Sequence, residues 1–293
     1  MTSPKIWISE LGDYKLLDSG NGKKLEEISG IRMIRSEPKA WWQQKLNKSE
    51  WNKAIVKFEH EKGKWNIGEG VPKDLFFDYS NLKLKLKFPL NSKHFGIFPE
   101  QESQWRWIKE ECVKKNKHHK PIKVLNLFGY TGVATLVASA NGAQVTQVDG
   151  SRTIINWARE NQDESKLNMN NIRWILDDVM DFVKREVKRG NKYDAIIMDP
   201  PSFGRGPKGQ VWKIENDLVP LLYNCRRLLS DEPAFVILNM YSTELSSITL
   251  KNLIEEMMAG INGQISFGEL ALKEDGGDRL LPLSIFTNWS SIK

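Results

Sequence analysis

Short runs of alternating apolar and polar residues dominate the first hundred positions of the chain. In residues 82–88, LKLKLKF, the apolar side chains fall on one face and the lysines on the other, which is the period-2 pattern of a half-buried strand. Asn21-Gly22 and residues 62–64 (KGK) lie between such runs and are typical of hairpin turns. The pattern predicts a small, mainly β domain over residues 1–95, with substrate recognition as its candidate role.

After residue 95 the pattern changes to apolar runs separated by segments of helical period. The strand candidates are residues 122–128, 144–149, 172–178, 193–199 and 234–240. Two strand-like segments around Asp275-Gly276-Gly277 predict a terminal hairpin. We therefore expect an α/β domain over residues 96–293, with a mostly parallel sheet covered by helices on both faces and a C-terminal antiparallel hairpin at its edge.

The composition excludes several classes of protein. With 40% hydrophobic and 27% charged residues, the chain is an ordinary globular protein and not a disordered one. Its two cysteines are too few for a disulfide framework and have no metal-ligand spacing. No apolar run has the length of a signal peptide core or a membrane span. We expect a reduced, cytoplasmic protein with no metal site and no membrane partner.

The charge of the chain leans basic, with a formal net charge of +6. Residues 1–100 hold 18 Lys and Arg against 13 Asp and Glu, so most of the excess (18 − 13 = +5) lies there. A positive field of this kind attracts polyanions such as RNA. A generally lysine-rich proteome would give the same value, so charge alone decides nothing.

Glycines and acids follow the ends of successive predicted strands, which is where doubly wound sheets bind ligands. A turn with two glycines three residues apart follows the first strand, the second ends at Asp149, and the third ends at Asp177-Asp178. The dinucleotide pattern G-x-G-x-x-G is absent, and large residues fill the positions where a pyrophosphate would need room. Carboxylates suit the hydroxyls of a ribose and the amine of an adenine.

These features together predict an adenosine ligand without phosphates, and S-adenosylmethionine fits. The candidate residues of the turn are Asn126, Phe128, Gly129, Tyr130, Thr131 and Gly132. Taken one at a time, each feature has a structural alternative: the glycines as strand-to-helix punctuation, and Asp149 as the cap of the following helix.

The fourth predicted strand ends in Asp199-Pro200-Pro201-Ser202-Phe203. Proline has no backbone N–H, so a carboxylate and a proline carbonyl would form a group of acceptors for an amine or the edge of a base. Phe203 would supply a stacking surface for a base turned into the pocket. Asp-Pro-Pro is also a common turn. We take Asp199, Pro200, Pro201 and Phe203 as catalytic candidates; Asp199 either accepts a proton or only orients the nucleophile, because methyl transfer from a sulfonium mainly requires alignment.

At these residues a family resemblance becomes visible. Residues 94–101 (HFGIFPEQ), 124–151 and 177–206 resemble the S-adenosylmethionine-dependent methyltransferases grouped with the bacterial 23S rRNA large-subunit base methyltransferases. The resemblance runs from about residue 90 to the C-terminus and implies a seven-stranded class I, Rossmann-like fold. It also implies donor contacts from Phe128 to Tyr130, Asp149 and Asp178.

The resemblance bears on two further choices. Asp178 is preferred over Asp177 because it precedes the small apolar Val179, as the family's acid does. The segment 94–101 flanks the methionine end of the donor in such proteins, which implicates Phe98 and Gln101.

The sequence also departs from this family pattern. Members that methylate carbon 5 of cytosine carry a cysteine just after the fifth strand, where this chain reads LNMYS at residues 238–242. Cys112 and Cys225 fall on the apolar stripes of helices, so we interpret both as core residues. The N-terminal segment does not match the family's usual RNA-binding domain. We expect methylation of a base nitrogen of RNA, with ribosomal RNA as the partner. The alternatives are a methyltransferase acting on a protein or small molecule, and a non-catalytic RNA-binding member of the fold.

Overall fold

The computed structural model describes residues 3–115, 120–241 and 244–292, which form two compact units. Unit 1 comprises Met1–Trp7, Gln104–Glu269 and Ser284–Lys293. Unit 2 comprises Ile8–Ser103 and Leu270–Leu283. Each unit combines segments that are distant in sequence, and the boundary after residue 95 stays a prediction.

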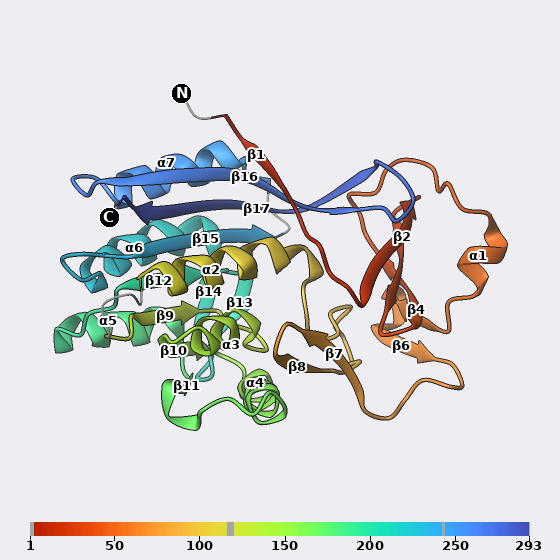
Figure 1. The fold of residues 1–293 in the computed structure, drawn as a ribbon, viewed down its shortest axis with the longest axis horizontal. Helices are drawn as coiled ribbons and strands as arrows, with labels where there is room; N and C mark the ends of the chain where they lie inside the picture. Colours follow the sequence, from red (N-terminus) through yellow and green to blue (C-terminus); the bar gives the residue numbers. More distant parts are fainter. Residues whose placement is uncertain (1–2, 116–119, 242–243, 293) are drawn as a thin grey trace. The chain divides into compact units, whose positions relative to one another are not determined.

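Unit 1 is built on a sheet of eight strands, in the order β1-β16-β17-β15-β12-β9-β10-β11 (Figure 1), of which only Ile8 and the parts of β16 and β17 within Leu270–Leu283 are assigned to unit 2. The strands are β1 (Lys5–Ile8), β9 (Lys123–Leu127), β10 (Gln144–Asp149), β11 (Ile172–Leu176), β12 (Ala195–Met198), β15 (Phe235–Tyr241), β16 (Gly263–Lys273) and β17 (Leu280–Ser291). The five strands β9, β10, β11, β12 and β15 pair in parallel, and β17 pairs antiparallel to β15. The predicted class I architecture is confirmed, and β1 adds an eighth strand at the edge.

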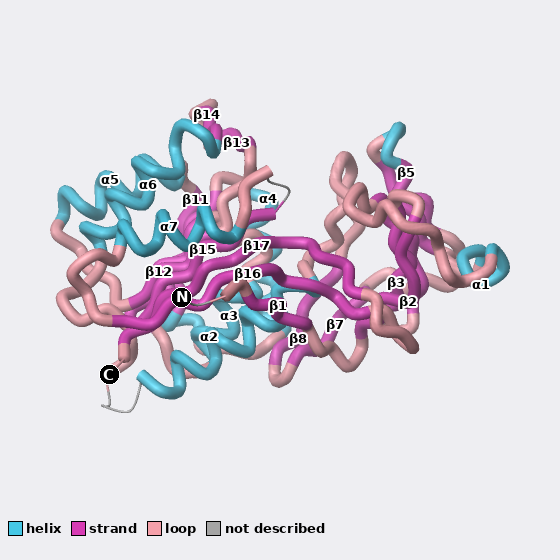
Figure 2. Tube along the Cα trace, turned by 90° about the horizontal axis from the view of Figure 1, so that it is seen from above, coloured by secondary structure: helices cyan, strands magenta, loops and turns pink. Residues whose placement is uncertain are grey.

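Helices cover both faces of this sheet. They are α2 (Glu102–Lys115), α3 (Val133–Ala140), α4 (Arg152–Glu164), α5 (Val179–Arg189), α6 (Ile214–Leu228) and α7 (Ser247–Met257). Figure 2 shows α5, α6 and α7 along one face and α2 and α3 along the other. The apolar stripes of α5, α6 and α7 bury Phe182, Leu221 and Ile254 against the strands in one large core. Burial of this kind is the main stabilising term of the unit.

Unit 2 is mainly β, as the alternating pattern predicts. Its strands are β2 (Tyr14–Gly20), β3 (Lys23–Ile28), β4 (Ile31–Ser36), β5 (Val56–Glu59) and β6 (Lys64–Ile67) in one sheet, and β7 (Leu75–Tyr79) with β8 (Leu82–Leu86) in another. A short helix, α1 (Lys48–Asn52), follows β4. Asn21 and Gly22 have φ of 52° and 72° and close the β2–β3 hairpin as expected. The leucines of β8 are buried and its lysines are more exposed, which confirms its period-2 pattern.

A buried ion pair lies in the larger sheet of unit 2. Arg35 donates two hydrogen bonds to the carboxylate of Glu26, and the Tyr14 hydroxyl donates a third at 2.7 Å. These bonds compensate the burial of the Glu26 charge: with Arg35 and Lys24 beside it, the pKa of Glu26 falls to about 2 although burial alone would raise it. The pair therefore stays charged inside the unit.

Candidate active site

The turn after β9, which we call the donor loop (residues 128–132), has an unusual backbone. Phe128 and Tyr130 have φ of 58° and 50°, and Gly132 has φ of 88°. Left-handed backbone at two large side chains costs about 1–3 kcal/mol each and is found where surrounding contacts enforce it, often at functional sites. Only glycine fits at position 129, because a Cβ there would clash with the Gln147 side chain at a distance of 2.3 Å.

A chain of hydrogen bonds between buried side chains stabilises the donor loop. The Asn126 amide donates to the Thr135 hydroxyl at 2.9 Å, and that hydroxyl donates to Gln147 at 2.7 Å. The Gln147 amide in turn donates to the Tyr130 carbonyl at 2.8 Å. Asn126 is only 2% exposed, so it acts on the loop through this chain of bonds. Thr131 is fully buried, and its carbonyl accepts from the Asn161 amide at 2.9 Å.

Asp149 ends β10 beside the donor loop. One carboxylate oxygen accepts from the Tyr130 N–H at 3.1 Å and the other from the Ser151 N–H at 2.9 Å. The first bond stabilises the left-handed conformation of Tyr130. Burial raises the pKa of Asp149 to about 6, and the two N–H donors only partly oppose this shift. Each oxygen retains a lone pair, so the carboxylate fits the two hydroxyl donors of a ribose.

Asp178 precedes α5 and caps it, because one of its oxygens accepts from the Asp181 N–H at 2.9 Å. The other oxygen lies against Gly206, where an added Cβ would approach it to 2.9 Å. The neighbouring Asp177 pairs with Arg185. The two acids Asp149 and Asp178 thus stand at the carboxyl ends of adjacent strands, where they fit a hydroxyl- and amine-bearing nucleoside and repel phosphate.

Asp199 follows β12, and its N–H donates to the Leu127 carbonyl of the neighbouring strand at 3.4 Å. This bond places the acceptor segment (residues 199–201) directly beside the donor loop. The Pro201 carbonyl accepts from the Trp212 indole at 2.7 Å, so it is already engaged within the protein. The Phe203 side chain is 55% exposed.

A small hairpin follows the acceptor segment and was not anticipated from the sequence. Strands β13 (Phe203–Arg205) and β14 (Val211–Lys213) pair antiparallel. Trp212 in this hairpin is buried and packs on Phe128 with ring centroids 4.9 Å apart. The available signal was the glycine-rich stretch GRGPKG between two short runs, but strands of three residues are too short to show a period. Trp212 therefore links the acceptor segment to the donor loop.

Two of the sequence-predicted site residues belong to unit 2. Phe98 precedes a short 3-10 helix, η2 (Pro99–Gln101), and its ring packs on His94 with centroids 4.7 Å apart. Gln101 is 7% exposed, and its N–H donates to the Phe98 carbonyl at 2.9 Å. The other predicted residues lie together in unit 1, and a contact of Phe98 or Gln101 with the donor stays a prediction.

Both cysteines are fully buried, which confirms their interpretation as core residues. Burial raises the pKa of Cys112 to about 12 and raises that of Cys225 as well, so neither is a ready thiolate nucleophile. Within the described residues, no group of three His, Cys, Asp or Glu side chains is arranged to hold a metal ion. None of the helices in that same part of the chain is long and apolar enough to cross a membrane.

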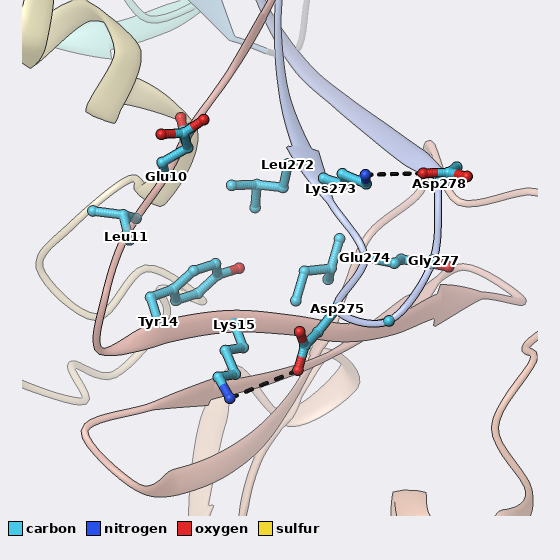
Figure 3. A pocket seen from close by; sticks show the side chains of 13 residues that line it. Glu10, Leu11, Tyr14, Lys15, Leu272, Lys273, Glu274, Asp275, Gly277 and Asp278 are labelled. Carbon is cyan, nitrogen blue, oxygen red and sulfur yellow. Dashed lines mark ion pairs between the residues drawn. The ribbon is translucent and has the colours of Figure 1, made fainter.

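An open pocket of about 610 Å³ lies elsewhere, within unit 2 (Figure 3). Its lysines are paired with its acids: Lys15 with Asp275 at 3.7 Å and Lys273 with Asp278 at 2.9 Å. None of the predicted site residues lines it, and nothing in its lining points to a ligand.

The class of protein defined by this fold and site agrees with comparisons to known proteins. Residues 60–234 match the family model described as S-adenosylmethionine-dependent methyltransferase, so the chain belongs to that family. Its methyl donor is S-adenosylmethionine, and it is a methyltransferase.

Particular relatives refine the comparison. A crystal structure of the SAM-dependent methyltransferase from Agrobacterium tumefaciens is 38% identical, with a TM-score of 0.93 over 99% of this chain and 94% of that one. SMU.776, solved in complex with SAH, shares the fold at 19% identity, with a TM-score of 0.71 over 96% of this chain and 76% of that one.

Two curated relatives are named for ribosomal RNA. The large subunit methyltransferase K/L of Hahella chejuensis is 34% identical over 166 residues, which are 56% of this chain and 21% of that protein. Methyltransferase K of Neisseria meningitidis serogroup B is 28% identical over 56% of this chain and 44% of its own length. The chain thus spans less than half the length of either of these relatives.

Proposed function

We propose that the protein methylates a nitrogen of an RNA base, with ribosomal RNA as the substrate. The observation that carries the proposal is the acceptor segment: Asp199 is tied to the Leu127 carbonyl at 3.4 Å, next to the donor loop. The names of the curated relatives K/L and K, both ribosomal RNA methyltransferases, support the substrate class.

S-adenosylmethionine supplies an electrophilic methyl group on a sulfonium. The chain's own groups then have two tasks: they orient the nucleophilic nitrogen and they take up the proton that this nitrogen loses. Pro200 and Pro201 have no backbone N–H, so neither proline adds a donor to the acceptor oxygens of the Asp199 carboxylate and the Pro200 carbonyl. These oxygens suit an exocyclic amine, whose N–H bonds they would hold while the lone pair faces the methyl group.

The state of the cysteines supports nitrogen over carbon as the target. Methylation at carbon 5 of a pyrimidine uses a thiolate that adds to the ring. Cys112 and Cys225 are both fully buried with raised pKa values, so neither is available for this addition. Transfer to a nitrogen requires no covalent intermediate with the protein.

Radiolabelled donor offered to deproteinised rRNA tests the proposal. The rRNA comes from a strain in which the gene is deleted, and rRNA from the parent strain, already modified, is the matched control. We expect label in the first RNA and little in the second. Label that appears only in a protein or small-molecule fraction of the deletion strain would refute the RNA assignment.

The role of Asp199 is tested in the same assay. We expect Asp199→Ala to lower turnover at least a hundredfold while the dissociation constant for S-adenosylhomocysteine stays within threefold of wild type, because in this proposal Asp199 contacts the substrate base and not the adenosine of the donor. Asp199→Asn keeps the shape and one acceptor oxygen, so partial activity in that variant would indicate orientation, and none would indicate proton transfer. Normal turnover in Asp199→Ala would remove Asp199 from the mechanism.

A further inference from the structure

The β13–β14 hairpin has two faces of different character. In its register, Gly204 lies opposite Trp212, while Phe203 lies opposite Lys213 and Arg205 opposite Val211. Because opposed residues share a face and neighbours alternate, Phe203, Arg205, Val211 and Lys213 point to one side. That side is exposed, with Phe203 at 55% and Val211 at 49%, whereas Trp212 on the other side is 5% exposed. We call the exposed side the outer face.

The inner side fixes the hairpin to the methyl-transfer site. Trp212 packs on Phe128 of the donor loop and donates to the Pro201 carbonyl. At the turn, the Gln210 amide donates to the Asp181 carboxylate in the first turn of α5, at 2.9 Å. The backbone at Arg205 lies close enough to Gly150 that a Cβ on that glycine would be 3.3 Å from the Arg205 carbonyl. The outer face therefore has a fixed position beside the acceptor segment.

The outer face carries two positively charged side chains, Arg205 and Lys213. In the described part of the chain, the Arg205 and Lys213 side chains enter no ion pair. Of the acids that follow the hairpin along the chain, Glu215 and Asp217 lie in the first turn of α6, and the Asp217 carboxylate accepts from the Lys213 N–H at 2.7 Å. Exposed apolar surface between two cations fits a flexible polyanion with flat rings better than it fits an apolar protein partner.

We propose that the outer face binds the single-stranded RNA segment that flanks the target base. Val211 and Phe203 supply the surface for a base, and Arg205 and Lys213 contact the phosphates on either side. The hairpin thereby delivers the target to the acceptor segment. This inference rests on the proposed function, because it assumes an RNA substrate.

Neutralising the two cations tests the inference. Binding of a fluorescein-labelled, mixed-sequence single-stranded RNA 20-mer is measured by anisotropy in the presence of S-adenosylhomocysteine, over a range of salt. The logarithm of the association constant falls linearly with the logarithm of the salt concentration. Loss of two phosphate contacts lowers the magnitude of this slope by about 1.4, which corresponds to about tenfold weaker binding near 0.15 M salt. We expect this for Arg205→Gln/Lys213→Gln, with donor affinity within twofold of wild type as the check on folding.

The matched control is Lys184→Gln/Lys188→Gln, which removes two exposed cations of α5 and is expected to change RNA binding less than twofold. If the hairpin variants bind the 20-mer like wild type while the wild type methylates rRNA, the proposed role of the outer face in RNA binding is wrong and the proposed function stands. A wild-type protein that neither binds the 20-mer nor labels rRNA would overturn both. Competition by poly-glutamate as effective as that by unlabelled RNA would overturn the assignment to RNA.

Discussion

The raised pKa of Asp149 predicts a pH dependence of donor binding. A ribose hydroxyl donates to the ionised carboxylate, so the protonated form of Asp149 binds the nucleoside less well. With a pKa of about 6 in the free protein, the carboxyl is mostly ionised at pH 7 and mostly protonated at pH 5. The apparent dissociation constant is multiplied by 1 + 10^(pKa − pH), which rises about tenfold from pH 7 to pH 5, or about 1.4 kcal/mol.

The assay is calorimetric titration with S-adenosylhomocysteine between pH 5 and pH 7, where the amino and carboxyl groups of the ligand largely keep their charges. We expect weaker binding as the pH falls, and release of about half a proton on binding at pH 6. The control is Asp149→Asn, which cannot titrate and is expected to bind weakly at every pH. An aspartate of ordinary pKa would change the affinity by only about a tenth over this range, so a flat wild-type profile would refute the reasoning. An equal slope in Asp149→Asn would assign the titration to another group.

Three further predictions concern stability and reactivity. Gly132→Ala forces a Cβ to 2.9 Å from the Trp174 ring at φ 88°, so we expect a loss of about 2 kcal/mol and a melting temperature lower by about 5 °C in a thermal scan. Arg35→Met removes the two strongest hydrogen bonds of the buried Glu26 carboxylate and leaves it only Lys24 and Tyr14, so urea unfolding is expected to show a loss of about 3 kcal/mol, partly restored by adding Glu26→Gln. Both cysteines are expected to resist thiol reagents in the native protein and to react fully in denaturant; fast native labelling would contradict their burial.

Much of the fold could be predicted because the strands of unit 1 are buried on both faces and read as apolar runs. Strand β12 is fully buried, and the two prolines after Asp199 mark its end without ambiguity. The hairpin turn at Asn21-Gly22 could be predicted equally well, because both residues adopt the positive φ that a tight turn between two alternating strands requires. These elements are determined by residues next to one another in the sequence.

Elements that depend on distant partners could not be predicted. The four residues of β1 carry no period, and they form a strand because the edge of β16, more than 250 positions away, offers unpaired backbone groups. Gly268 shows the closeness of this pairing, since a Cβ there would meet the backbone of Lys5. The hairpin of β13 and β14 is likewise stabilised by the packing of Trp212 on Phe128 and by the hydrogen bond from Gln210 to α5. Neither contact can be predicted from the local sequence pattern.

A structural role and a functional role of the same acid need not exclude each other in this site. Asp178 caps α5 with one oxygen and keeps the other at the hairpin turn, and Asp149 orders the donor loop while each of its oxygens retains a lone pair. A cap fixes the rotamer of the carboxylate at no cost to its remaining acceptor capacity. Fixed acceptors bind a nucleoside with less loss of side-chain entropy than mobile ones would. The same hydrogen bonds by which Asp178 caps α5 and Asp149 orders the donor loop would therefore also prepare both acids to hold the donor.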